Sequence, residues 1–165
     1  MRSLVLHPPV SIARDFIDYP YCSDLGAVQL AAVLDARGHE THLVNAYALA
    51  GSGLTWRDDD RAHLGASVAE VRSTVRGLTL VRGAPDLVVV AYTPFHRPPG
   101  RDDVLGELLA GLREDLPRAT VLLADCYQSG QHYVEADGDA VLGAYPECDG
   151  WVKYEAEETL GQLAD

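Results

Sequence analysis

Three histidines and one aspartate follow apolar segments of this chain, at positions where buried strands should end. These four residues are His7, His96, Asp125 and His132. Imidazole and carboxylate side chains that converge from separate loops can bind a metal ion or transfer protons near neutral pH. Such a site requires all four side chains to point into one crevice. Without such a site, His7 is typical of a hydrogen-bonded histidine at a strand end, and His96 of an exposed loop residue.

Other catalytic and cofactor-binding motifs are missing from the sequence. The three cysteines, Cys22, Cys126 and Cys148, are widely spaced, with no CxxC pair and no zinc-type spacing to histidine. This pattern argues against a disulfide framework and a structural metal. The chain has neither the GxSxG turn of α/β-hydrolases nor the GxGxxG loop of dinucleotide-binding proteins. The sequence therefore shows no complete catalytic site, and whether the chain is an enzyme stays open.

The composition narrows the classes of partner. The chain has 165 residues and a formal net charge of −12, which argues against nucleic acid and against anionic membrane surfaces, since both select for clustered Lys and Arg. No apolar run approaches the roughly 18 residues of a membrane span. The N-terminus lacks the basic and apolar regions of a secretory signal. These features predict a single cytoplasmic domain over residues 1–165.

The elements that would position these side chains begin with a strand and a helix. Residues 4–6 form an apolar run typical of a strand buried on both faces. Asp24 is a candidate helix N-cap, and Gly38 is a candidate left-handed residue at the end of that helix. The apolar residues between them recur at helical spacing, at Ala27, Leu30, Ala31 and Leu34. The loop at 8–23 has about 16 residues, where such connections usually have two to six.

The rest of the chain continues the alternation. Further strands are expected at 39–45, 86–92, 120–124 and 149–154. Helices are expected with apolar stripes from Leu64 to Leu78 and from Leu105 to Leu116, and further helices at 134–142 and 155–163. The acidic run at 58–60 precedes the first of them, where carboxylates interact favourably with the helix dipole. The last helix would have Ala156, Leu160 and Leu163 on one face. Residues 47–55 are expected to be a connector.

This alternation predicts a Rossmann-like, three-layer α/β/α fold. Five strands favour a flavodoxin-like, doubly wound parallel sheet of order 2-1-3-4-5 with right-handed crossovers. Ligands of such sheets bind where the strand order reverses, at the carboxyl ends of the strands. The loops at 8–23 and 93–100 should therefore face one crevice, with 125–133 as a third wall.

Several segments, in this order, resemble one family over nearly the whole chain. They are HPP after the first strand, DLGAVQLAAVLDARGHETHLVNA, PDLVVVAYTP, PRATVLLAD and CDGWVKYEAEETLGQL. Together they resemble the N-terminal cobalamin-binding domain of cobalamin-dependent radical S-adenosylmethionine enzymes. RGHETHLVNA and EAEETL are the most specific parts of the match.

The resemblance implies a function and a set of binding residues. The domain would be metal-binding through cobalamin, and would position the corrin for a radical S-adenosylmethionine partner of the methyltransferase type. The 4Fe-4S cluster and S-adenosylmethionine would belong to that partner domain or chain, because the CxxxCxxC motif is absent here. The implied cofactor-binding residues are Pro8, Pro9, Tyr21, Cys22, Asp24, Leu25, Gly26, Tyr92, Thr93, Pro94, Asp125, Tyr127, Ser129 and Gly130.

The chain also departs from the family pattern. No DxHxxG motif follows the first strand, Ala124 and Asp125 stand where the family has paired glycines, and the GEGE turn reads YEAE. These differences support an alternative, in which the fold no longer binds cobalamin and serves as an interaction or substrate-presenting subunit. A small enzyme that uses the converging histidines is a third hypothesis.

Overall fold

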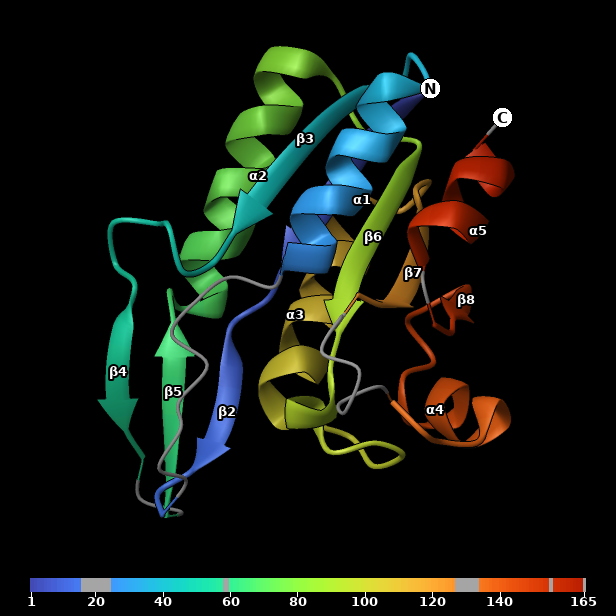
Figure 1. Ribbon diagram of the computed structural model, residues 1–165. Helices are drawn as coiled ribbons and strands as arrows, with labels where there is room; N and C mark the ends of the chain where they lie inside the picture. The colour runs from blue at the N-terminus through green and yellow to red at the C-terminus, as the bar shows by residue number, and fades with distance from the viewer. Residues whose placement is uncertain (16–24, 58–59, 127–133, 155, 165) are drawn as a thin grey trace.

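The core of the protein is a five-stranded, all-parallel sheet. The computed structural model describes residues 1–15, 25–57, 60–126, 134–154 and 156–164. Its main sheet is built from β1 (Arg2–His7), β3 (Glu40–Asn45), β6 (Leu87–Tyr92), β7 (Thr120–Asp125) and β8 (Gly150–Val152). Their spatial order is β3-β1-β6-β7-β8 (Figure 1). Counted along the chain, this is the order 2-1-3-4-5 of a doubly wound sheet, so the predicted fold class is confirmed.

Helices cover both faces of this sheet (Figure 1). On one face, α1 (Leu25–Ala36) and α5 (Ala156–Ala164) pack together through Leu30, Leu34 and Leu160, over Val5 and Val89. On the other face lie α2 (Val68–Arg82) and α3 (Asp103–Asp115). The short α4 (Gly138–Ala144) joins the core of that second face through Val141. None of the described helices is long and apolar enough to cross a membrane.

The ends of the helices follow local sequence signals. Gly38, just after α1, has a φ of 86°, which suits glycine because it has no Cβ to clash. Ser67 begins α2, and its hydroxyl accepts a hydrogen bond from the backbone nitrogen of Glu70 at 3.2 Å. The Asp102 carboxylate begins α3 by accepting from the nitrogen of Leu105 at 3.0 Å. Gly38 was expected at the end of its helix and Asp102 stands just before the apolar stripe expected from Leu105, whereas Ser67 lies inside the segment expected to be helical from Leu64.

A second, smaller sheet corrects the sequence-based prediction. It is antiparallel, with order β2-β5-β4, and consists of β2 (Val10–Ala13), β4 (Gly53–Trp56) and β5 (Arg61–Gly65). It lies beyond the carboxyl ends of the main strands, at the lower left of Figure 1. Part of the predicted loop at 8–23 and part of the predicted connector at 47–55 are therefore strands.

The prediction of a helix from Leu64 was wrong at its start, because α2 begins only at Val68. Leu64 belongs to β5 and packs with Val10, Ile12 and Ala62 in a separate apolar cluster. The acidic run does not precede a helix either. Asp60 stands beside the start of β5, where its carbonyl accepts a hydrogen bond from the nitrogen of Arg14 at 2.9 Å, and residues 58–59 lie outside the described residues.

Three smaller differences concern the C-terminal half. The helix expected at 134–142 is α4, and it begins later because Asp137 caps it by accepting from the nitrogen of Ala140 at 3.0 Å. Leu163 was expected on the core-facing side of the last helix, but it is 66% exposed. The loop at 93–100 contains a single 3₁₀ turn, η1 (Pro94–His96).

Candidate functional site

The candidate site lies at the carboxyl edge of the main sheet, where β1, β6 and β7 end side by side. β1 ends at His7, β6 at Tyr92 and β7 at Asp125. β6 pairs with both of the other strands, and Tyr92 and Asp125 are direct partners in the β6–β7 register. The chain crosses to opposite faces of the sheet after β1 and β6, so this is the switch point at which doubly wound sheets bind ligands.

His7 is a buried, neutral imidazole at this edge. Its ring meets the Tyr47 ring edge-on, with centroids 4.6 Å apart. Burial, and then the nearby His96, lower the pKa of His7 to about 4. Its Nδ1 has no hydrogen-bond partner among the described residues. Pro8 and Pro9 follow, both buried, and lead the chain directly into β2.

The turn after β6 buries a second imidazole. The His96 ring stacks on Tyr92 with centroids 5.6 Å apart, and its Nδ1 accepts a hydrogen bond from the backbone nitrogen of Thr93 at 3.0 Å. Complete burial lowers the pKa of His96 to about 4. Within the described part of the chain, neither His96 Nε2 nor the Tyr92 hydroxyl has a hydrogen-bond partner. The two histidines, Tyr47 and Tyr92 thus form a buried polar cluster, which we call the His/Tyr cluster.

Asp125 closes the edge on the side of β7. Its side chain is buried, and Oδ2 accepts a hydrogen bond from the backbone nitrogen of Val134 at 2.9 Å. This hydrogen bond joins the end of β7 to Val134, nine residues further along the chain. Asp125 is therefore a buried, hydrogen-bonded carboxylate at the carboxyl end of β7.

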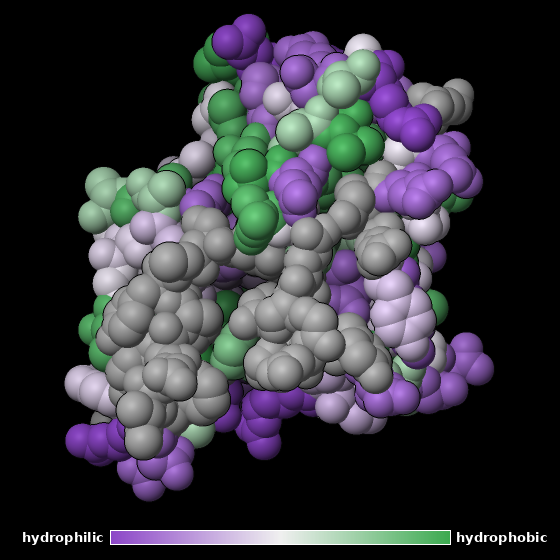
Figure 2. All heavy atoms as spheres, in the orientation of Figure 1, coloured by the Kyte–Doolittle hydropathy of each residue, from purple (hydrophilic) through white to green (hydrophobic). Residues whose placement is uncertain are grey.

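The start of α1 packs tightly against the end of β7. A Cβ atom on Gly26 would overlap the backbone carbonyl oxygen of Cys126, so only glycine permits this approach. The outward side of α1 is apolar and uncovered: Leu25 is 62% and Val28 42% exposed. Figure 2 shows this as a hydrophobic area over α1.

The structure brings together part of the predicted set. Pro8, Pro9, Tyr92, Thr93, Pro94 and Asp125 lie at the carboxyl edge, and Leu25 and Gly26 at the start of α1. The predicted residues Tyr21, Cys22, Asp24, Tyr127, Ser129 and Gly130, together with His132, lie outside the described residues. Tyr47 was not predicted, although its position two residues after β3 places it near the same edge. Among the described residues, no three His, Cys, Asp or Glu side chains are grouped so as to hold a metal ion.

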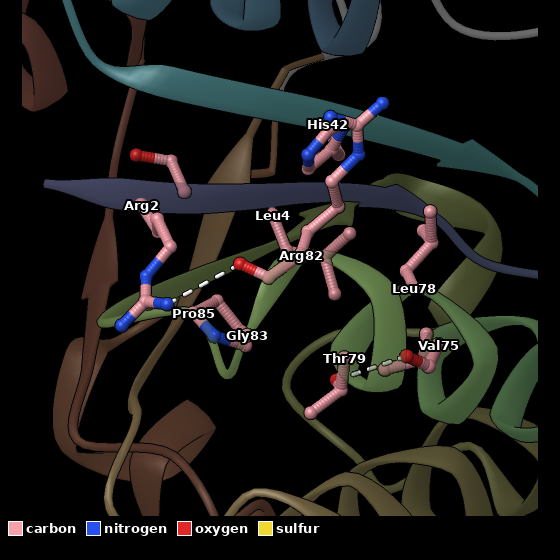
Figure 3. Close-up of a pocket in the computed structure, with 10 residues that line it drawn as sticks. Arg2, Leu4, His42, Val75, Leu78, Thr79, Arg82, Gly83 and Pro85 are labelled. Carbon is pink, nitrogen blue, oxygen red and sulfur yellow. Dashed lines mark hydrogen bonds between the residues drawn. The ribbon is translucent and has the colours of Figure 1, made fainter.

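The opposite edge of the sheet offers little space. A pocket of about 20 Å³ lies there between the C-terminal half of α2 and the start of β1 (Figure 3). Arg2 spans it and donates to the carbonyl oxygen of Arg82 at 3.3 Å. Its volume suits about one water molecule, so this pocket is no candidate for a cofactor.

Strand order and helix placement define the class: a doubly wound, flavodoxin-like α/β protein with an added antiparallel sheet beyond the carboxyl ends of its main strands. Comparison with protein-family models and with curated proteins found no match for this chain.

Proposed function

We propose that this chain is a cobalamin-binding domain that positions the corrin for a radical S-adenosylmethionine partner, most often in methyl transfer. The observation that supports this proposal best is the His/Tyr cluster at the switch point of the sheet. It presents buried polar atoms without partners at the edge where doubly wound proteins bind nucleotide-like groups.

The chemistry of these atoms fits the nucleotide tail and amide groups of cobalamin. A buried polar atom without a hydrogen bond costs roughly 1–3 kcal/mol, so a ligand that supplies partners is favoured. The Tyr92 hydroxyl can both donate and accept a hydrogen bond. The neutral imidazole of His7 can donate a hydrogen bond from one ring nitrogen and accept one at the other. Bound cobalamin would supply a cobalt centre able to carry a methyl group. This chain would bind and orient it.

The apolar side of α1 supports a partner domain. A helix that is apolar around almost its whole circumference is usually covered on all sides. In α1 only Gln29 and Asp35 have polar side chains, yet Leu25 and Val28 face outward. A catalytic barrel seated over the corrin edge could cover this surface.

Asp125 favours a second candidate function, a fold that has lost cobalamin and serves as an interaction subunit. Its carboxylate is buried in the place of the missing glycine and is hydrogen-bonded to the chain itself. A side chain in that place narrows the path of the nucleotide tail.

Binding of hydroxocobalamin tests both candidates. The purified chain is mixed with hydroxocobalamin, desalted, and its visible spectrum recorded. Colour retained near one equivalent supports the cobalamin-binding domain, whereas a colourless protein refutes it and favours the interaction subunit.

The variant Asp125→Gly tests whether the carboxylate obstructs the tail. We expect it to retain more cobalamin than the native chain, because it restores the space of a glycine. Asp125→Asn is the matched control, since it keeps the side-chain volume and an acceptor for Val134, and should retain no more than the native chain. Equal retention by both variants would contradict an obstructing role for this side chain.

A further inference from the structure

A second open pocket lies between the small sheet and the start of α3, and none of the residues of the carboxyl-edge site lines it. Its volume is about 270 Å³, close to the lower end of the range typical of small-molecule sites, about 300–1,000 Å³. Its lining comes from the small sheet, from the residue after η1 and from the start of α3. The lining residues are Ser11, Arg57, Arg61, Arg97, Arg101, Asp102 and Asp103. We call it the arginine pocket.

The charge of this pocket is opposite to that of the chain. The whole sequence carries −12 and has 13 basic residues, four of which are arginines at this one pocket, against two aspartates there. One of the two aspartates, Asp102, is buried; it caps α3 and also lies within ion-pair distance of Arg61, while Arg101 pairs with Glu147 outside the pocket. Arginines that gather in an acidic protein are brought together against the trend of its composition, which points to an anionic ligand.

Two of the arginines are held in place by the fold. Arg61 donates from Nε to the Ser11 hydroxyl at 2.6 Å and from Nη2 to the Ser11 carbonyl, and Nη2 lies 3.9 Å from Asp102 Oδ2. Arg101 forms a two-pronged ion pair with Glu147, at 2.6 and 3.0 Å. Their guanidinium groups are therefore ordered before any ligand arrives, which reduces the entropy lost on binding.

Arg97 supplies the cation that is available to a ligand. Its backbone is left-handed, with φ 59°, and its nitrogen donates to the Pro94 carbonyl at 3.1 Å, so its position after η1 is defined. The side chain is exposed and has no ion-pair partner among the described residues. It also lines an adjoining, more open hollow, so a ligand can reach it from solvent; the charged residues around that hollow are Arg14, Asp15, Asp60, Arg61 and Arg97.

We propose that the arginine pocket binds the phosphate group of a small phosphorylated molecule. A guanidinium group suits phosphate because it can donate two parallel hydrogen bonds to the phosphate oxygens. Arg97 has such donors available, whereas Arg61 already donates to Ser11 and Arg101 to Glu147. The phosphate belongs either to a separate phosphorylated molecule or to the phosphodiester of a cofactor's nucleotide tail. The pocket itself does not depend on the function proposed above.

Titration with inorganic pyrophosphate tests this site. Isothermal titration calorimetry at low ionic strength should show saturable binding to the full chain. Arg97→Ala should weaken it about tenfold or more, since it removes charge-assisted hydrogen bonds from an exposed side chain that the fold does not need. Arg118→Ala is the matched control, an exposed arginine outside the pocket, and should leave the affinity unchanged.

The outcomes separate the possibilities. No saturable binding up to about 10 mM pyrophosphate, or equal weakening by Arg97→Ala and Arg118→Ala, overturns the proposal, because affinity would then be absent or due to diffuse charge. If Arg97→Ala weakens pyrophosphate binding, the amount of hydroxocobalamin that this variant retains is compared with the amount retained by the native chain. Equal retention indicates that the pocket binds a separate phosphorylated molecule, and reduced retention indicates that it binds the phosphodiester of the nucleotide tail. A native chain that binds pyrophosphate but retains no cobalamin supports the pocket while refuting the function proposed above.

Discussion

Replacement of His96 by asparagine should remove at least half of the acid sensitivity that the His/Tyr cluster gives to this fold, because His96 also helps to lower the pKa of His7. His7 and His96 both have a folded-state pKa of about 4, against an ordinary value of 6.5. Between these values the unfolded chain binds more protons than the folded chain, so stability falls as the pH is lowered from 6.5 towards 4. Above pH 6.5 both rings are neutral in both states, and this loss disappears.

The magnitude follows from the two pKa values. For one histidine whose pKa falls from 6.5 to about 4, the free energy of unfolding decreases by about 2 kcal/mol between pH 7 and pH 5. Two such histidines together give about 4 kcal/mol. Protonation of His96 at Nδ1 would also remove the acceptor for the Thr93 nitrogen. An asparagine oxygen can still accept that hydrogen bond but does not titrate.

The assay is urea unfolding at pH 7, 6 and 5. We expect His96→Asn to be less stable than the native chain at pH 7, because it loses the stacking on Tyr92, but to lose about 2 kcal/mol less between pH 7 and 5. Carboxylates whose pKa is lowered by arginines, such as Asp115 beside Arg72, contribute equally to both proteins and cancel in the comparison. An unchanged slope in His96→Asn would refute the assignment of a buried, neutral His96.

Two further substitutions test how the edge is built. Gly26→Ala should destabilise the fold by about 3 kcal/mol and lower the Tm by roughly 10 °C, because the added methyl group would overlap the Cys126 carbonyl. Gly77→Ala is the control: this helical glycine has open space around it, so the substitution should raise the Tm slightly. A similar fall in the Tm of both variants would contradict the close contact at Gly26. Tyr145→Phe should cost about 1–2 kcal/mol in urea unfolding, since the buried nitrogen of Asp102 donates to the Tyr145 hydroxyl at 2.8 Å; an unchanged free energy of unfolding would refute that role of the hydroxyl.

The main sheet could be predicted from the sequence because parallel strands are buried on both faces and read as continuous apolar runs. Residues 87–92 are one such run, and every residue of β6 is buried. The helical stripes were equally readable where they pack on the sheet, as in α3, whose Leu105, Leu108, Leu109 and Leu112 are all buried. The strand order then followed from the rules for doubly wound sheets.

The small sheet could not be predicted, for a reason of length and separation. β2 and β4 have four residues each, too few for a clear alternation, and β2 pairs with β5, which lies about fifty residues away. Leu64 therefore matched the helical spacing of α2 although its neighbours in space are strands.

The same reason applies to the His/Tyr cluster and to the arginine pocket. The pKa values of His7 and His96 are lowered because tertiary packing excludes water from two rings that the sequence places at strand ends. The arginine pocket gathers side chains from β5, from the residue after η1 and from the start of α3, which no sequence spacing relates. Apolar periodicity is a local property and can be recognised in the sequence itself. The burial of a polar group and the convergence of charges depend on which distant segments of the chain come into contact.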